Sequence, residues 1–200
     1  MLDATPEDLL VEVRDRAMLL LGFASGMRRS ELVSLDVGDL AFVEEGVDVF
    51  LRRSKTDPEG EGRVIGIPYG RQSETCPVVA LRRWIGIAGL SKSDPLFPRL
   101  VPSGRPSGRP RKNVGRIRPG RLSAQGVARV VQRAASRAGL DAAAVAGHSL
   151  RSGFATEAAA QGAPEHAIMR QTGHRSLAML RRYIREGDRY RDNAASYLGL

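Results

Sequence analysis

Apolar residues recur with helical spacing near the start of the chain. The positions of this pattern are Leu9, Leu10, Val13, Ala17, Leu20, Leu21 and Ala24. The segment Thr5-Pro6-Glu7-Asp8 favours a helix start, because it offers a hydroxyl cap, an early proline and two acids at the positive end of the helix dipole. The pattern therefore predicts a helix that Gly26 ends. A second short helix is predicted over Arg28 to Leu35.

Three stretches with β-character follow the predicted helices. They are Leu40 to Val43, Val47 to Arg53 and Arg63 to Pro68. Turn residues separate them at Glu45-Gly46 and within Asp57 to Gly62, which favours antiparallel pairing. The sequence therefore predicts a small three-stranded antiparallel sheet.

Most of the remaining chain is predicted to be helical. The helical segments are Pro77 to Ala88, Ala124 to Ala138, Ser149 to Gln161, Pro164 to Thr172 and Leu177 to Glu186, with a weaker one at Arg189 to Leu198. Residues 99 to 121 carry seven arginines, one lysine, four prolines, four glycines and no acid, so a loop is predicted there. The predicted fold class is α+β, mostly helical, with the small sheet embedded among helices.

Composition narrows the class of protein and of partner. The 200 residues are 42% hydrophobic, which fits one domain over residues 1–200. The formal net charge of +9 favours a polyanionic partner, with nucleic acid ahead of membrane, over a merely basic enzyme. Cys76 is the only cysteine, and the acidic amino terminus lacks the basic region of a signal peptide. We therefore expect a cytoplasmic location and no membrane association.

Six side chains from distant segments form the candidate catalytic set. They are Arg28, Lys55, His148, Arg151, His174 and Tyr183. Cationic donors can neutralise a pentavalent phosphorus while a phenol oxygen attacks it, and a proton donor can serve the leaving oxygen. No metal-binding cluster and no glycine-rich nucleotide loop is evident in the sequence, so neither a metal nor a cofactor is predicted.

The cationic members of this set also have plain structural interpretations. His148 and Arg151, three residues apart, can share one phosphate, or they can be a capping histidine and a solvated arginine. Arg28 can form an exposed ion pair with Glu31, or Glu31 can support the site by orienting the arginine. Lys55 falls in or beside the second turn of the sheet, where a lysine is usually solvent-exposed.

Tyr183 follows His174 by nine residues. Taken alone, it is a half-buried packing tyrosine on an amphipathic helix. A phenol has a pKa near 10, so a nucleophilic tyrosine needs nearby cations and a base to lose its proton. Tyr190 and Tyr197 are rival candidates that lie further from His174.

Taken in order, these motifs resemble the catalytic domain of the tyrosine recombinase (phage integrase) family. The segment Ala24-Ser25-Gly26-Met27-Arg28-Arg29-Ser30-Glu31 matches the pattern around the family's first arginine. Lys55 matches its hairpin lysine, and His148 to Arg151 matches its histidine-x-x-arginine box. Gly173-His174 and then Tyr183 complete the set. The resemblance runs from about Thr5 to the end of the chain.

The resemblance implies DNA cleavage and rejoining without metal or ATP. Tyr183 is expected to attack a DNA phosphate and form a 3′-phosphotyrosyl bond. Arg28, Arg151 and His174 are expected to bind the non-bridging oxygens. Lys55 is expected to act as the acid at the leaving group, with His148 assisting the proton transfers.

The resemblance also implies partners and two departures from the family pattern. The partner is double-stranded DNA, on which a nucleoid-associated protein is expected to form dimers or tetramers. A tail that contains Tyr197, Leu198 and Leu200 either links the subunits or is a fraying chain end. The family's amino-terminal core-binding domain is expected to be absent, since the chain starts where that domain would end. The basic insertion is predicted to contact the DNA backbone, or to be a linker that only adds charge. Its candidate contacts are Arg105, Arg109, Arg111, Lys112, Arg116 and Arg118.

Two other functions fit the same residues. One is a catalytically silent DNA-binding module or integrase remnant, in which the helices from Ser149 to Thr172 act as a helix-turn-helix. The chain has all six catalytic side chains. Because groove reading requires none of them in this arrangement, their presence disfavours this function. The other is a relaxing enzyme similar to type IB topoisomerases, which uses the same chemistry without strand exchange.

Overall fold

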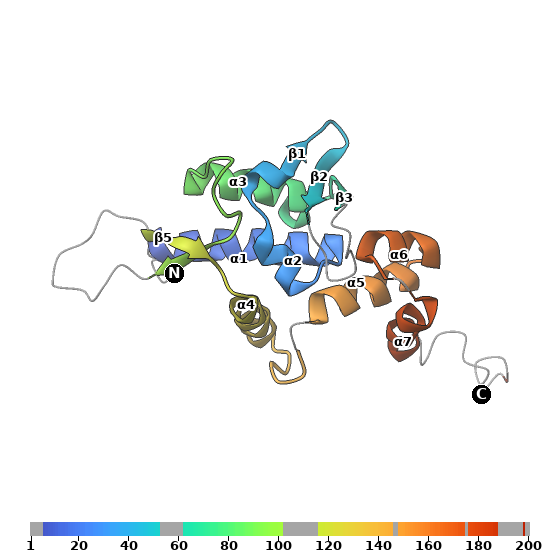
Figure 1. Ribbon diagram of the computed structural model, residues 1–200. Coiled ribbons are helices and arrows are strands. Elements are labelled where there is room, and N and C mark those ends of the chain that lie inside the picture. The colour runs from blue at the N-terminus through green and yellow to red at the C-terminus, as the bar shows by residue number, and fades with distance from the viewer. Residues whose placement is uncertain are drawn as a thin grey trace.

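The computed structural model describes residues 6–52, 62–101, 116–145, 148–174, 176–187 and 198. Figure 1 shows the helices and strands of this part of the chain. In chain order they are α1 (Pro6–Ser25), α2 (Arg29–Ser34), η1 (Val37–Asp39), β1 (Leu40–Phe42), β2 (Gly46–Leu51), β3 (Arg63–Pro68), η2 (Ser73–Thr75), α3 (Pro77–Ala88), β4 (Pro98–Val101), β5 (Arg116–Arg121), α4 (Ala124–Arg137), α5 (Ser149–Ala160), α6 (Glu165–Thr172) and α7 (Leu177–Gly187). The predicted mostly helical α+β class is confirmed.

Helix α1 ends where the sequence predicts, at a glycine. Gly26 has a φ of +58°, a left-handed conformation that favours glycine. A Cβ atom at Gly26 would lie 2.8 Å from the Thr172 methyl group and 2.9 Å from the Phe154 ring. Gly26 is therefore required both by its backbone conformation and by the close approach of α5 and the end of α6.

The first sheet is antiparallel in the order β1-β2-β3, as predicted. Its inner face is formed by alternate residues of β2 and β3, all at most 2% exposed. They are Val47, Val49, Leu51, Ile65 and Ile67. Phe50 and Val64 pair across the opposite face, which is exposed. The alternation thus places one face of the sheet on the core and leaves the other face to solvent.

The prediction of a loop over residues 99–121 is wrong at both ends of the segment. Strands β4 and β5 pair there as a second, two-stranded antiparallel sheet. The pairing is continued by a backbone hydrogen bond from Leu122 to Phe97 of 2.9 Å. The guanidinium of Arg121 anchors β5 on the Asp36 carboxylate at 2.6 Å. A backbone ladder forms whatever the side-chain charges are, so the basic, proline-containing composition hid it.

Several predicted DNA contacts cannot be placed. Arg105, Arg109, Arg111 and Lys112 lie outside the described residues. Arg116 and Arg118 belong to β5, but their side chains are outside the described part.

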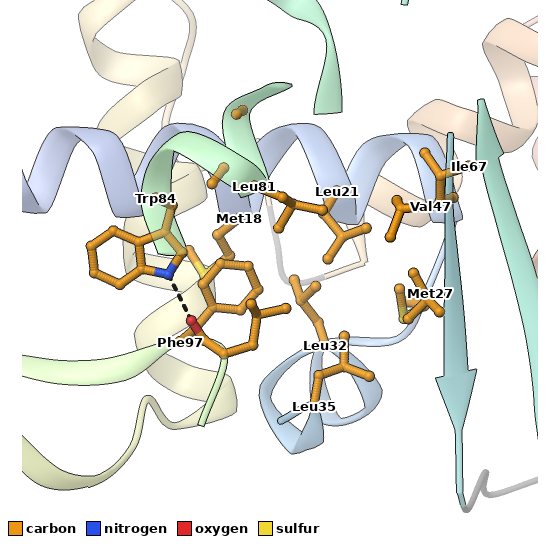
Figure 2. Close-up of a cluster of buried hydrophobic side chains, with 14 of the residues drawn as sticks. Met18, Leu21, Met27, Leu32, Leu35, Val47, Ile67, Leu81, Trp84 and Phe97 are labelled. Carbon is orange, nitrogen blue, oxygen red and sulfur yellow. Dashed lines mark hydrogen bonds between the residues drawn. The ribbon is translucent and has the colours of Figure 1, made fainter. Parts of the chain in front are cut away.

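The main core lies between α1, α2, α3 and the inner face of the first sheet (Figure 2). Trp84, Met18 and Phe97 are among its largest fully buried side chains. The indole Nε1–H of Trp84 donates a hydrogen bond of 2.7 Å to the Leu96 carbonyl, so its polar atom is satisfied inside the core. Large aromatic and aliphatic side chains of this kind supply most of the free energy of burial.

A second, smaller cluster joins α5, α6 and α7. Its buried members are Ala155, Ile168 and Leu180, and Tyr183 packs against them. These three helices lie together at one end of the molecule, beside the carboxyl end of α1 (Figure 1). The seam between the two clusters is where the candidate catalytic residues gather.

Candidate active site

Four of the six predicted catalytic residues form one cluster at this seam. Arg28 and Arg151 both act electrostatically on His174. Tyr183 interacts with Arg151 in the same way and lies against His174. The cluster therefore combines two arginines, a histidine and a tyrosine that the sequence separates by up to 155 residues, from 28 to 183.

Arg28 and Glu31 form a partly buried pair, not the exposed one considered from the sequence. The predicted helix was to begin at Arg28. Helix α2 instead begins at Arg29, and Arg28 is its N-cap residue. The Glu31 carboxylate accepts the Arg28 backbone N–H at 2.8 Å and its Nη1 at 2.7 Å. Glu31 is only 3% exposed, so the carboxylate reaches back to cap the helix and fixes the guanidinium in one place.

Arg151 lies in the first turn of α5 and is 4% exposed. Its Nη1 donates to the Gly26 carbonyl at 2.8 Å and to the Thr172 carbonyl. Burial is the largest cause and the nearby Arg28 the next, and together they lower the pKa of Arg151 to about 10. The guanidinium therefore remains cationic at neutral pH while it joins the end of α1 to the end of α6.

The other two predicted catalytic residues are His148 and Lys55. His148 is the N-cap residue of α5, and its side chain is exposed. His148 is exposed whereas Arg151 is buried, so the two side chains lie in different surroundings. Lys55 lies outside the described residues.

His174 follows α6 directly after Gly173, whose φ is +70°. Its imidazole is 9% exposed, and Nδ1 lies 2.8 Å from the Thr172 hydroxyl. Burial is the largest cause and the cations Arg151, Arg28 and Arg63 contribute, and together they lower the pKa of His174 to about 4. His174 is therefore neutral at pH 7 and can exchange a proton rather than act as a fixed cation.

Tyr183 lies on α7 and is half-buried. Its ring centroid is 5.6 Å from that of His174, with the two planes inclined by 37°. The main-chain carbonyl of Tyr183 accepts a hydrogen bond of 3.1 Å from Thr156, which ties α7 to α5. The rival tyrosines Tyr190 and Tyr197 lie outside the described residues.

Arg63 also belongs to the cluster, although no sequence motif pointed to it. It is the first residue of β3, and its guanidinium donates to the carbonyls of Arg170, Gln171 and Thr172 at 3.0 to 3.3 Å. Its Nη2 is also 3.9 Å from the Glu31 carboxylate. Arg63 thereby caps the carbonyls that the end of α6 leaves without helical partners.

Sequence reasoning missed Arg63 because the signal is spatial. Its hydrogen-bond partners are 107 to 109 residues away, and its own position is that of an ordinary basic strand residue. Burial lowers the pKa of Arg63, Glu31 opposes that shift and Arg28 reinforces it. An arginine that is desolvated next to two others indicates a site prepared for an anion.

The arrangement suits phosphate chemistry. Three arginines act electrostatically on a neutral imidazole, and one of them, Arg151, also acts on the phenol beside it. These groups match the needs of a phosphoryl group under attack. Within the described ranges, no group of three or more histidine, cysteine, aspartate or glutamate side chains is placed to hold a metal ion. Nor is any helix in the described part long and apolar enough to cross a bilayer.

Comparison with known proteins gives the same classification as these motifs. An integrase/recombinase xerD homolog of Selenomonas ruminantium is 42% identical over 192 residues, which are 96% of this chain and 53% of that protein. A tyrosine recombinase XerD of Xanthomonas axonopodis is 33% identical over 191 residues, covering 90% of this chain and 53% of that protein. The chain thus spans about half the length of these curated relatives.

The fold is also that of a solved recombinase structure. The XerH site-specific recombinase bound to palindromic difH substrate superposes with a TM-score of 0.69 at 20% sequence identity. The match covers 96% of this chain and 47% of that one. The profile of the phage integrase family matches residues 2–189, nearly the whole chain. With the sequence motifs, the fold and this match in agreement, the chain belongs to the phage integrase family, as the resemblance implied.

Proposed function

We propose that this chain is the catalytic domain of a site-specific DNA recombinase that cuts and rejoins strands with Tyr183 as nucleophile. The observation that carries the proposal is the position of the Tyr183 ring, 5.6 Å from the His174 ring, in the electrostatic reach of Arg151. A phenol alone is a poor nucleophile at neutral pH, so its value depends on these neighbours. Two curated relatives bear recombinase names, and the XerH structure contains its DNA substrate.

In this mechanism the arginines hold the scissile phosphate. Arg28, fixed by Glu31, and Arg151, fixed by two carbonyls, bind the non-bridging oxygens. Arginine forks suit this task because they bond two oxygens at once, and burial strengthens their attraction for the developing charge. Their positions are set before DNA arrives, so little reorganisation is needed during the reaction.

The proposed bond changes are those that the resemblance to the family implies. The Tyr183 oxygen attacks phosphorus, the bond to the 5′ oxygen breaks, and a 3′-phosphotyrosyl ester remains. Lys55 is proposed to give a proton to the departing 5′ oxygen, with His148 assisting the proton transfers. Attack by the 5′ hydroxyl of a partner strand on the ester reverses these steps without metal or ATP.

The partners and location are part of the same proposal. The partner is double-stranded DNA. The positive charge of residues 99–121 adds to the attraction of the protein for the DNA backbone. We also propose that the protein forms dimers or tetramers on DNA, with the carboxyl-terminal tail as one contact, and that its location is cytoplasmic and nucleoid-associated. Leu198 of that tail is 69% exposed.

A suicide-substrate assay tests the nucleophile. A pool of nicked duplexes with randomised flanks is incubated with the protein, and the products are separated on a denaturing gel. We expect a covalent protein–DNA adduct that Tyr183→Phe abolishes. Tyr69→Phe is the matched control, because Tyr69 is 45% exposed after β3, and it should keep full adduct formation.

Two results would contradict the proposal. An adduct that survives Tyr183→Phe would remove Tyr183 as nucleophile. DNA retardation without any adduct in the unmodified protein would favour the silent DNA-binding module over the enzyme.

A further inference from the structure

Thr172, the last residue of α6, uses both of its polar groups to organise the cluster. Its carbonyl accepts from Arg151 and from Arg63. Its hydroxyl lies 2.7 Å from the Ile168 carbonyl and 2.8 Å from Nδ1 of His174. The hydroxyl thus stands between a carbonyl of its own helix and the imidazole.

The single hydroxyl proton decides the direction of these two bonds. A carbonyl oxygen only accepts, so the contact with Ile168 requires Thr172 to donate. If the proton pointed at His174 instead, two oxygens would face each other at 2.7 Å with no proton between them. With its proton committed to Ile168, the Thr172 oxygen accepts from Nδ1–H of His174.

We infer that Thr172 is a positioning residue that holds neutral His174 as the Nδ1–H tautomer, leaving the lone pair on Nε2. Nε2 is then the ring nitrogen that can accept a proton from Tyr183. A neutral imidazole in this tautomer accepts a proton at Nε2 and cannot donate one there. His174 therefore cannot bind a non-bridging oxygen as a donor until it has taken up a proton.

The surroundings of His174 keep it neutral until that step. Among the described residues, the charged or titratable groups that face it are Arg151 on α5, Arg28 before α2, Arg63 on β3 and Tyr183 on α7. Burial and the three cations together lower the pKa of His174. A bound phosphodiester adds a negative charge to this group and so opposes the effect of the cations.

The consequence, which rests on the proposed function, is a two-stage use of one imidazole. As the bond between the Tyr183 oxygen and phosphorus forms, the phenol proton passes to Nε2 of His174, and the bond to the 5′ oxygen breaks. The 5′ oxygen takes its proton from the acid proposed at Lys55. The new Nε2–H then donates to a non-bridging oxygen of the ester, and religation returns the proton to the tyrosine.

Nuclear magnetic resonance of the DNA-free protein tests the tautomer directly. Long-range ¹H–¹⁵N spectra distinguish a ring nitrogen that bears a proton from one that bears a lone pair. The chain has three histidines, and His174→Gln identifies the signals of His174. At pH 7 we expect protonated Nδ1 and unprotonated Nε2.

Two substitutions at Thr172 connect the tautomer to the reaction. Thr172→Val keeps the branched shape but lacks the acceptor, so we expect the Nε2–H form to appear and adduct formation to slow by roughly 10²-fold. Thr172→Ser keeps the hydroxyl and should preserve both the spectrum and the rate to within a few-fold.

The spectra and the gel fail independently. A wild-type His174 with its proton on Nε2, or an unchanged tautomer in a folded Thr172→Val protein, would overturn the inference while leaving Tyr183 as nucleophile untouched. If Thr172→Val does not fold, the wild-type spectrum and the serine variant still decide. Loss of the adduct in wild type with the expected tautomer would instead contradict the proposed function.

Discussion

The two hydrophobic clusters on either side of the candidate active site differ in how much apolar surface they bury. The core around α1, α3 and the first sheet contains Trp84, Phe97 and many fully buried aliphatic side chains. The cluster of α5, α6 and α7 has only three buried members within the described residues, Ala155, Ile168 and Leu180. One half of the site therefore stands on a large core, and the other half stands on a small one.

Polar bonds hold the lightly packed helices to the main core. Arg151 reaches the Gly26 carbonyl, and Gln171 donates to the Ala24 carbonyl at 3.1 Å. Arg63 holds the end of α6 from β3. Local opening is easiest where few apolar contacts must be broken, so we expect α5–α7, and Tyr183 with them, to open before the Arg28 side of the site. Such a division suits the proposed role of Tyr183, which must approach and leave DNA while the arginines stay in place.

The largest effect is expected from Trp84→Ala in the main core. Removing a fully buried indole and leaving the Leu96 carbonyl without its donor should lower the free energy of unfolding by about 4 kcal/mol. Urea denaturation gives this value, and hydrogen exchange should show faster exchange throughout the described chain. Trp84→Phe retains a ring and should cost less.

Ile168→Ala is the matched change in the small cluster. It should lower the free energy of unfolding by about 2 kcal/mol. Amide hydrogen exchange should become faster chiefly in α5, α6 and α7, and much less in α1 and α3. Equal acceleration of exchange in α1 and in α6 would show that the two clusters open as one unit, which would end the comparison.

Arg151→Lys should act on the rate of reaction rather than on the stability of a cluster. Lysine carries the same charge but cannot make the planar fork, so adduct formation should slow by about 10²- to 10³-fold. The rate of adduct formation on the nicked duplex measures this loss. Arg181→Lys is the control, because Arg181 is an exposed residue of α7 paired with Glu165. Equal rates in the two variants would show that a point charge is sufficient at Arg151.

A pH-dependent loss of stability should follow from His174. Its pKa is about 4 in the fold and near 6.5 in the unfolded chain, so the unfolded chain binds more protons between these values. The unfolding free energy should therefore fall as the pH drops from about 6.5 towards 4, by roughly 2 kcal/mol more in wild type than in His174→Gln. Urea denaturation at pH 7 and pH 4.5 measures the difference.

The exposed histidine of α6 provides the control for this titration. His166→Gln should keep the wild-type pH dependence. If wild type and His174→Gln lose stability in parallel, His174 is not held neutral by its surroundings.

The sequence predicted those parts of the fold whose signals are local. Apolar spacing and Gly26 defined α1, and Pro77 to Ala88 was predicted with the observed bounds of α3. Strands β4 and β5 were missed because their pairing depends on backbone bonds between distant segments. The sequence motifs predicted Arg28, Arg151, His174 and Tyr183. The residues that hold them in place could not be predicted, because their contacts depend on where the helix ends meet in the fold.

Arg63 and Thr172 illustrate this limit most clearly. Nothing in the segment around Arg63 indicates that its guanidinium will reach a helix end more than 100 residues later. Thr172 has the same character, since its hydroxyl acquires a role only when His174 folds back over it. The roles of these two residues depend on where the carbonyls at the end of α6 lie in the folded chain, and the sequence does not show that position.

The smallest effect, about 1 kcal/mol, is expected from Arg63→Lys. A lysine ammonium can reach one or two of the carbonyls of residues 170–172 but cannot span all three, so the end of α6 should open more easily. Native-state hydrogen exchange should show this loss in α6 and little change in α1. Arg52→Lys, in the exposed partner of Asp39 at the end of β2, is the control. Unchanged protection of α6 in Arg63→Lys would mean that the apolar contacts of Ile168 alone hold the helix, and that the polar seam contributes orientation without stability.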